Sequence, residues 1–487
     1  MSQVDLLLMN PPIKKVSTSY RSKGTPPLAL AYLAAVSEKN GYSVECLDLN
    51  LHKKGLSLSE YVIDKNPKVV GITFVTEQRF EAFQLFKQIK SINPNLITVA
   101  GGPHVTLCAE DTLRHINSID YIVRGEGEIT FIELLNAIFS GNSRSMIKGV
   151  SYINNGEIVH TPDRVVIKNL DELPYPAMHL LSFEDYNFHI QVEGYGEIKA
   201  APILSSRGCP FKCNFCACTK IWGAMWRFRS PEHVIAEIRY LKDKYRINAI
   251  WFVDDNFNVN RKRMYSICER IVHENLDIKW ICNVRVDNLK KEDLELMSKS
   301  GCISIEFGAE SGSQNILDKV VHKKITVDQI KRADEWCYQL GIKSDAQFII
   351  SHPYETTEDA NKTMELMKSL KGQSTLQILK VYPGTEVEKI AYEIGLLPPN
   401  FSWALDKGNS DIIPSITGNA PLFFDKLTVN EVSSYMTTAW IDIRSFALLK
   451  IINKVVKKIR SPKEFISLMK MGFLFVFKKV FGGIKYG

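Results

Sequence analysis

The chain has 487 residues, of which 45% are hydrophobic and 24% are charged. This length is sufficient for two or three domains, and the balance is typical of a globular protein and not of a disordered chain. No uninterrupted apolar run approaches the roughly 20 residues that span a bilayer. Most of the ten cysteines stand alone and no signal peptide is recognisable, so we expect a reducing cytoplasm and no disulfide framework.

The formal net charge of +7 is concentrated at the end of the chain. Residues 445–487 hold ten Lys or Arg residues and one acid, which leaves a net charge of −2 for the rest. The body of the chain is therefore nearly neutral, and we expect it to bind no nucleic acid.

Residues 1–145 alternate short apolar runs with helical patterns. We expect helices over residues 27–40, 77–92 and 129–139, and strands over residues 4–9, 43–48, 69–75, 96–102 and 121–125. This alternation of strands and helices predicts an α/β fold with a doubly wound, Rossmann-like parallel sheet. Ligands of such sheets bind at the carboxyl ends of the strands. The cofactor-binding residues predicted there are Asn10, Thr73, Gly101, Gly102, His104, Gly125 and Glu126.

Residues 146–199 are predicted to form a connector. The segment 150–159 reads as a hairpin around Asn155-Gly156. Pro174 and Pro176 then favour an extended chain, because each disfavours helix in the residue before it.

Residues 200–394 contain the most specific motif. Cys209, Cys213 and Cys216 have the spacing C-x3-C-x2-C in a loop that begins at Gly208. A loop this compact can present three thiolates to a cluster of soft metal ions, and a 4Fe–4S cluster with three local thiolates has one open iron. One alternative is three structural cysteines. Another is a zinc site completed by Cys218, although no second C-x2-C knuckle follows.

With Phe215 before its last cysteine, the motif resembles the signature of radical S-adenosylmethionine (SAM) enzymes. The resemblance implies that the three cysteines are catalytic metal ligands, that SAM binds the open iron, and that Phe215 lies in the cofactor site. It also implies a partial (β/α)6 TIM-type barrel. The six strands expected for it lie at residues 203–204, 249–253, 278–282, 302–307, 344–350 and 376–381.

Polar residues at the carboxyl ends of barrel strands usually carry the chemistry. Asp254 and Asp255 follow the second strand, and Glu310 and Ser311 belong to a segment that resembles the G-x-E-S-G sequence by which the family contacts SAM. We predict that Asp254, Glu310 and Ser311 bind SAM, although these carboxylates could instead cap the following helices. Relatives typically have Gly-x-Pro-Gly-Glu-Thr after the fifth strand, where Tyr354 replaces a glycine here. Tyr354 is therefore predicted to be a catalytic residue that reaches the substrate.

The segments AGGPH and RGEGE of the first domain, together with KGTPPLALAYLAA, resemble the cobalamin-binding domain of cobalamin-dependent (class B) radical SAM enzymes. The alternative is an ordinary flavodoxin-like domain whose glycines serve only turns. The Asp-x-His-x-x-Gly motif that supplies a cobalt ligand elsewhere is missing. His104 is therefore expected to shape its loop or to contact the corrin, and not to bind cobalt.

The resemblance implies a methyltransferase that uses a 4Fe–4S cluster, SAM and cobalamin to methylate an unactivated carbon of a small-molecule or lipid-like substrate. It also implies an electron donor such as flavodoxin or ferredoxin. One alternative is a radical cyclase like the anaerobic magnesium-protoporphyrin ester cyclase. A tRNA methylthiotransferase is disfavoured, because only Cys46 and Cys108 precede the triad. A non-catalytic cobalamin or redox module is disfavoured by six strands with polar ends.

Residues 395–487 are predicted to be a helical, basic region that covers the active site. Residues 465–481 combine large aromatic side chains with lysines. Two interpretations remain open: a helix that packs on the barrel, or an interfacial helix that makes peripheral contact with the inner face of a membrane.

Overall fold

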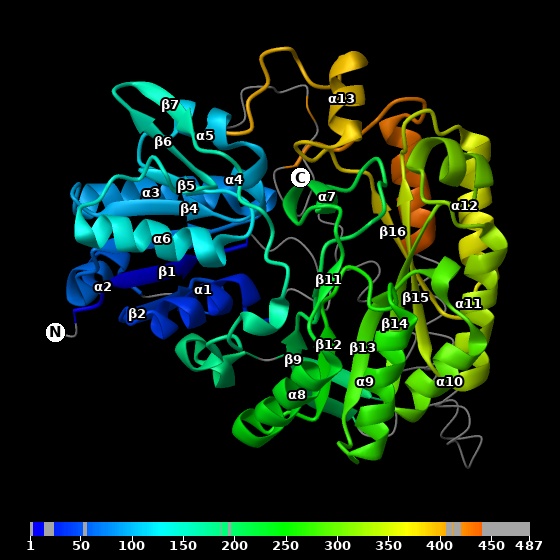
Figure 1. The fold of residues 1–487 in the computed structure, drawn as a ribbon. Coiled ribbons are helices and arrows are strands. Elements are labelled where there is room, and N and C mark those ends of the chain that lie inside the picture. Colours follow the sequence, from blue (N-terminus) through cyan, green and yellow to red (C-terminus); the bar gives the residue numbers. More distant parts are fainter. Residues whose placement is uncertain are drawn as a thin grey trace, which may run out of the picture. The chain divides into compact units, whose positions relative to one another are not determined.

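The structure is a computed structural model that describes residues 3–13, 24–51, 56–186, 188–192, 196–405, 412 and 420–440. Residues up to Val429 form one compact unit, and a second unit begins at Asn430. The first unit contains two seven-stranded sheets (Figure 1). In the second unit residues 430–440 are helical, and the tail at 465–481 lies outside the described residues.

The first sheet has the order β2-β1-β3-β4-β5-β6-β7. Its strands β1 to β5 are parallel, which confirms the doubly wound prediction. The predicted hairpin is present, but β6 pairs antiparallel with β5 and extends this sheet, so it is not part of a separate connector. The strands are β1 (Leu6–Asn10), β2 (Val44–Asp48), β3 (Val69–Thr73), β4 (Ile97–Gly101), β5 (Tyr121–Val123), β6 (Val150–Asn154) and β7 (Glu157–His160).

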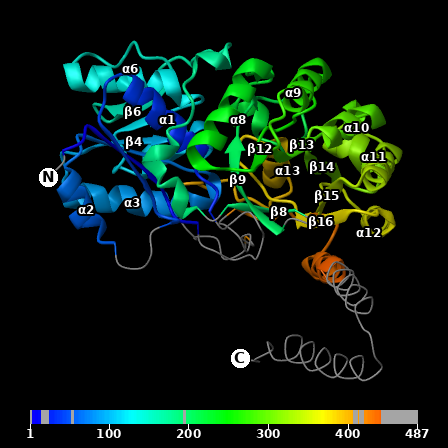
Figure 2. The same cartoon turned by 90° about the horizontal axis from the view of Figure 1, so that it is seen from below.

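Helices cover both faces of the first sheet (Figure 2). On one face lie α1 (Leu28–Lys39) and α6 (Gly127–Ser140), where Phe131 packs beside Gly71 of β3. On the other face a cluster of buried apolar residues joins β1, β3 and β4 to α2 (Leu58–Lys65), α3 (Arg79–Ile92), α4 (Pro103–Leu107) and α5 (Ala109–His115). The helix α2 was not predicted, because Val62 is its one buried residue and it has no long apolar stripe.

The second sheet has the order β16-β15-β14-β13-β12-β9-β8. Six of its strands are parallel, which confirms the predicted partial barrel. The edge strand β8 pairs antiparallel with β9 and was not predicted. The strands are β8 (His189–Val192), β9 (Gly196–Ile203), β12 (Ala249–Phe252), β13 (Lys279–Val284), β14 (Cys302–Glu310), β15 (Lys343–Ile350) and β16 (Gln373–Ile378).

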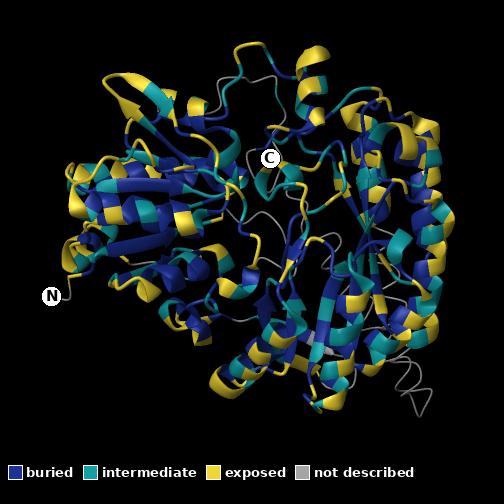
Figure 3. Cartoon of the chain, viewed as in Figure 1, coloured by how far each residue is buried: buried dark blue, intermediate teal, exposed yellow. Residues whose placement is uncertain are grey.

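Five of the six helices of the partial barrel begin at a side-chain cap, and α10 does not. Ser230 accepts a hydrogen bond from the His233 backbone and Pro231 occupies the first helical position, as predicted for α8. The strands are largely buried and the outer faces of the helices are exposed (Figure 3). The helices are α8 (Pro231–Tyr245), α9 (Arg261–His273), α10 (Lys291–Lys299), α11 (Val327–Leu340), α12 (Thr357–Ser369) and α13 (Glu386–Glu393).

The C-terminal segment differs from the predicted helical region. In the described residues 395–405 and 420–428 there is no helix; helical structure begins at residue 429. Instead, the chain pairs with the segment that follows β16: the Val381 N–H donates to Pro421 O and the Phe423 N–H donates to Leu379 O. None of the helices that the structure describes is both long enough and apolar enough to cross a membrane.

Candidate functional site

The cysteine loop, residues 208–218, begins at a two-stranded ribbon of β10 (Ser206–Arg207) and β11 (Arg227–Phe228). Gly208 has φ +86°, and a Cβ atom there would lie 2.4 Å from the carbonyl oxygen of Met225. Only glycine fits this left-handed, crowded position. The ribbon and Gly208 together determine the position of Cys209.

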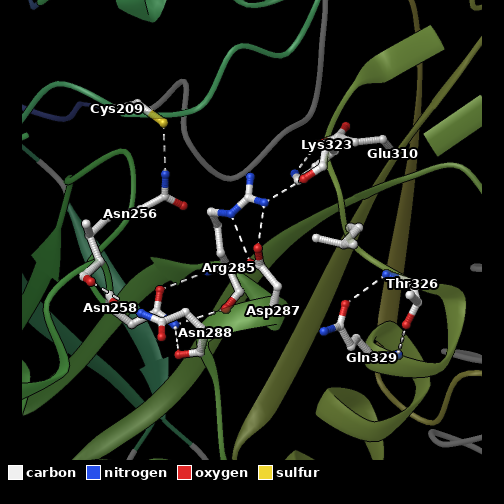
Figure 4. A network of polar contacts seen from close by, with 12 residues as sticks. Cys209, Asn256, Asn258, Arg285, Asp287, Asn288, Glu310, Lys323, Thr326 and Gln329 are labelled. Carbon is white, nitrogen blue, oxygen red and sulfur yellow. Dashed lines mark hydrogen bonds and ion pairs between the residues drawn. The ribbon is translucent and has the colours of Figure 1, made fainter. Parts of the chain in front are cut away.

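Several barrel elements hold the loop (Figure 4). The Asn256 amide, just after β12, donates to Cys209 Sγ at 3.3 Å. The Arg285 guanidinium, after β13, lies 3.5 Å from the centre of the Phe211 ring. The Asn214 N–H donates to the carbonyl oxygen of Val321, at the end of the π-helix η7 (Ile316–Val321). The loop is therefore fixed by the carboxyl side of the barrel, as a radical SAM cluster site requires.

Cys218 is the first residue of the short helix α7 (Cys218–Ile221), and its thiol donates to Asp255 Oδ2 at 3.0 Å. It also lies within hydrogen-bonding reach of Cys209 and Cys216, which lowers the pKa of both thiols. Burial raises the pKa of Cys213 to about 11. Among the described residues no three His, Cys, Asp or Glu side chains converge closely enough for one metal ion.

A buried ion pair stands beside the loop. Lys323 Nζ donates to Glu310 Oε1 at 2.6 Å, and the Lys323 carbonyl accepts from Arg285 (Figure 4). Glu310 has φ +60°, a strained conformation for a residue with a side chain. Gly308 leaves room for the pair, because a Cβ there would meet both charged groups within 2.3 Å. The predicted residue Glu310 is thus positioned with one carboxylate oxygen on Lys323.

The loop after β15 has a left-handed backbone at the two positions where the family pattern has glycine. Ser351 has φ +73° and Tyr354 has φ +62°. Glu355 Oε2 accepts the backbone N–H groups of Ser351 and His352, and Asp425 of the C-terminal segment accepts that of Tyr354. These contacts hold a strained loop in one conformation. The Tyr354 side chain is 55% exposed, and its catalytic role stays a prediction.

This loop contains buried polar atoms without partners: Ser351 Oγ, both ring nitrogens of His352, and Glu355 Oε1. Burial lowers the pKa of His352 to about 4 and raises the pKa of Glu355 to about 7. The His352 ring lies 6.2 Å from that of Phe215. Buried polar atoms without partners need a ligand or water, so these atoms beside the cysteine loop suit a polar ligand such as SAM.

The carboxyl edge of the first sheet, where cobalamin is predicted to bind, comprises Gly101, Gly102 and Gly125 and is named the cobalamin edge after that prediction. A Cβ built on Gly101 or Gly125 would meet nothing within 4 Å. Gly102 differs from both because it is crowded: at φ +98° its Cβ would lie 2.6 Å from the carbonyl oxygen of Phe74, whereas Gly125, at φ +70°, has no neighbour. Open space over two strand ends is what a flat macrocycle needs to approach the backbone.

The cobalamin edge adjoins the barrel. Glu77 accepts a hydrogen bond from the Tyr382 hydroxyl, and Asp111 accepts one from Ser402. In one apolar cluster, Cys108 and Leu107 pack with Phe215 of the cysteine loop. The carboxyl ends of both sheets therefore meet around the cysteine loop.

Two predicted residues of the first domain have structural roles. The Asn10 side chain donates to Asp48 and accepts from Gln78, which ties together neighbouring strand ends. His104 is fully buried against Phe74, its Nδ1 within 3.2 Å of Thr76 Oγ1, and burial lowers its pKa. His104 therefore shapes its loop, one of the two roles expected for it, and a contact of its unpartnered Nε2 with the corrin stays a prediction. Thr73, half-buried at the end of β3, stays a prediction.

Three further predicted residues have side chains with partners inside the protein. Asp254, fully buried, accepts from the Ser205 backbone and from the Ser205 and Ser206 hydroxyls, and burial raises its pKa. Buried Ser311 accepts from the Ser313 N–H. Glu126 is enclosed by two arginines. These contacts brace strand ends and loops, and the predicted roles of the three residues in cofactor binding stay predictions.

The sequence analysis missed Asn256, Lys323 and His352 as site residues. Asn256 and His352 follow the second and fifth barrel strands, so strand-end position was an available signal. The sequence held no such signal for Lys323, because this residue follows the π-helix η7 and lies 13 positions after Glu310, the residue that it contacts.

Comparison with known proteins agrees with this geometry. The sequence matches the Radical SAM superfamily over residues 203–367 and the B12 binding domain over residues 16–135. It is 36% identical over 399 residues to an uncharacterized methyltransferase of Pyrococcus horikoshii, covering 82% of this chain and 85% of that protein. It is 30% identical to the anaerobic magnesium-protoporphyrin IX monomethyl ester cyclase of Rubrivivax gelatinosus, covering 70% of this chain and 62% of the cyclase.

The fold is also that of a solved structure. The radical SAM methyltransferase TsrM of Kitasatospora setae, with cobalamin and a 4Fe–4S cluster bound, superposes with a TM-score of 0.69 at 19% identity, covering 91% of this chain and 89% of that one. The fold and site thus define a radical SAM enzyme with a B12-binding domain. The chain belongs to the cobalamin-dependent radical SAM methyltransferase family, and its cofactors are a 4Fe–4S cluster, SAM and cobalamin.

We predict that Cys209→Ala, Cys213→Ala and Cys216→Ala each lose the bound cluster, because each removes one of three iron ligands. Iron and sulfide per chain and the iron–sulfur absorbance after anaerobic reconstitution measure the loss. Cys218→Ala is the control and should keep the cluster, since its thiol donates to Asp255. Equal metal loss in Cys218→Ala would instead support the zinc alternative.

We predict that Gly101→Ala and Gly102→Ala separate cofactor binding from stability. The Gly101→Ala methyl group enters open space, so the variant should unfold like the wild type but bind hydroxocobalamin more weakly. Gly102→Ala should lose roughly 1–3 kcal/mol of unfolding free energy through strain at φ +98°. Denaturation and equilibrium dialysis measure the two effects. Wild-type cobalamin affinity in Gly101→Ala would contradict the assigned edge.

Proposed function

We propose that this methyltransferase acts on a small, largely apolar molecule, whose unactivated carbon is held between the cysteine loop and the cobalamin edge. The observation that carries the proposal is the apolar cluster that joins Leu107 and Cys108, next to the cobalamin edge, to Phe215 and Trp403. The name of the cyclase relative gives magnesium-protoporphyrin IX monomethyl ester as its substrate, a small molecule with an apolar ring, which supports the same substrate class.

The chain's own residues prepare this reaction. When bound, the cluster with SAM supplies radical hydrogen abstraction, and cobalamin supplies a methyl group. Cys209, Cys213 and Cys216 would hold the cluster, and the Asn256 amide would hydrogen-bond a ligand sulfur. Glu310, oriented by Lys323, would accept a hydrogen bond from SAM.

The C-terminal segment would exclude water from the reacting centre. It pairs with the chain after β16, and Asp425 reaches the Tyr354 backbone at the end of β15. Closing this side of the barrel protects a radical from solvent. Because the C-terminal segment would cover the reacting centre, it would also contribute to the choice of substrate.

A radical cyclisation without methyl transfer is the second candidate, favoured by the similarity to the cyclase. The test is an incubation of the anaerobically reconstituted enzyme with reductant, SAM labelled in its methyl group, and organic and aqueous fractions of a cell extract. We predict S-adenosylhomocysteine, 5′-deoxyadenosine and a labelled product from the organic fraction. The matched control is Cys213→Ala, which should give none of them.

Two outcomes would contradict the proposal. A labelled product from the aqueous fraction alone would exclude the apolar substrate class. Formation of 5′-deoxyadenosine and of a new, unlabelled product, without S-adenosylhomocysteine, would favour cyclisation.

The cluster also needs an electron donor, and we propose a small acidic carrier such as flavodoxin or ferredoxin. Cys216 is exposed, and so are Lys212 and Lys220 on the same loop and on α7. Lysines around an exposed redox site favour encounter with an acidic partner.

For the basic tail we propose peripheral contact with anionic membranes, in keeping with an apolar substrate. Each Lys or Arg near an anionic surface contributes about 1 kcal/mol, and residues 445–487 hold ten. We predict that the full chain sediments with phosphatidylserine-containing vesicles at low salt and that a truncation after Arg460 does so less. Equal, negligible sedimentation of both chains would leave a tail packed on the protein.

A further inference from the structure

We propose that a buried network of four charges sets the position of the cysteine loop relative to the cobalamin edge. The ion network consists of Glu126, Glu128, Arg207 and Arg227. In it Glu126 and Arg207 are positioning residues, although the sequence predicted Glu126 as a cofactor ligand. The inference rests on the family's cofactors and not on the identity of the substrate.

Glu126 is the centre of the network. Arg207 Nη1 donates to Glu126 Oε1 at 3.0 Å, and Arg227 Nη1 lies 2.8 Å from both oxygens of Glu126. Arg207 Nη2 donates to Glu128 Oε1 at 2.6 Å. Backbone groups complete the set, because the Ile167 N–H donates to Glu126 Oε2 and the Ile167 carbonyl accepts from Arg227.

Water has almost no access to these groups. The four side chains are between 2% and 8% exposed. Two carboxylates face two guanidinium groups, so the charges balance inside the network. A displacement of either side would separate buried charges at low dielectric, where their attraction is strong and solvent cannot replace it.

Each side of the network is close in sequence to one cofactor site. Glu126 directly follows Gly125 of the cobalamin edge, and Glu128 lies in the first turn of α6. Arg207 stands two residues before Cys209, and Arg227 is its partner in the β10–β11 ribbon. The side chains therefore connect the strand end that receives cobalamin to the base of the loop that receives the cluster.

Two other roles for Glu126 make different predictions. A carboxylate that binds cobalamin directly would be needed for cobalamin loading. A carboxylate that only stabilises the fold would affect unfolding and leave the geometry between the cofactors unchanged. A positioning residue changes that geometry while both cofactors still bind.

The test uses Glu126→Gln in the full-length holoenzyme, which preserves the shape of the side chain and removes its charge. Iron, sulfide and cobalamin per chain are measured after anaerobic reconstitution. Microwave power saturation of the cob(II)alamin electron paramagnetic resonance signal is then compared with the cluster oxidised and reduced. A reduced cluster speeds cobalt relaxation by an amount that depends on distance, and this readout needs no substrate.

We expect wild-type loading of both cofactors in Glu126→Gln, together with a shifted ratio of the saturation powers for the reduced and oxidised cluster. The matched control is Glu237→Gln. Glu237 is a carboxylate of equal burial that pairs with Arg229 at 3.1 Å, and both residues belong to the barrel side. Glu237→Gln should keep the wild-type ratio, even where it lowers the unfolding midpoint.

Loss of cobalamin from Glu126→Gln with the cluster retained would overturn the proposal in favour of a direct ligand. Full loading with an unchanged ratio would overturn it in favour of a purely stabilising role. If Glu126→Gln does not fold, Glu126→Asp takes its place, because it retains the charge and shortens the reach. If Glu126→Asp has the wild-type ratio of saturation powers for the reduced and oxidised cluster, the proposal is also overturned.

Discussion

The burial of Glu126, Glu128, Arg207 and Arg227 is the constraint on which the arrangement of this enzyme depends. Removing one partner of a buried ion pair is costly, by about 3–5 kcal/mol, because the remaining charge has neither water nor a counter-ion. Nothing in a sheet or a barrel alone requires these four charges. Each of these charges has its counter-ion only when the first domain lies against the β10–β11 ribbon, where the cysteine loop begins. The contacts that avoid the cost of an unpaired buried charge therefore also hold the first domain in position against the ribbon.

A second constraint is conformational and is concentrated at the carboxyl ends of the strands. Glu310, Ser351 and Tyr354 all have positive φ values although they carry side chains. Such residues persist only where surrounding contacts determine them. Lys323 provides this contact for Glu310, and Glu355 and Asp425 provide it for the β15 loop. Ser351 also has an unpartnered hydroxyl oxygen, and the other unpartnered polar atoms belong to His352 and Glu355 of the same loop, which indicates a site organised in advance of ligand binding.

Charge is also distributed unevenly around the cysteine loop. Arg285 stacks on Phe211 and Lys323 is buried nearby, while the Asn256 amide donates to Cys209 Sγ. Hydrogen bonds and positive charge near cluster sulfurs favour the reduced, more negative state. These groups lie in the interior, whereas Cys216 and its neighbouring lysines are at the surface. The loop thus has one side that contacts buried polar groups and another side that is exposed.

The sequence by itself determined what depends on local order along the chain. The spacing of Cys209, Cys213 and Cys216 fits within one loop, and alternating apolar runs and helical patterns specify parallel sheets, so the cluster motif and both sheets were predictable. The roles of Glu126, Asp254 and Ser311 were not, because they depend on partners that become neighbours only on folding. Glu126 meets Arg207 across 81 positions and Asp254 meets Ser205 across 49. A carboxylate at a strand end can bind a cofactor or neutralise a buried arginine, and only the tertiary structure, by placing the arginine, decided between them.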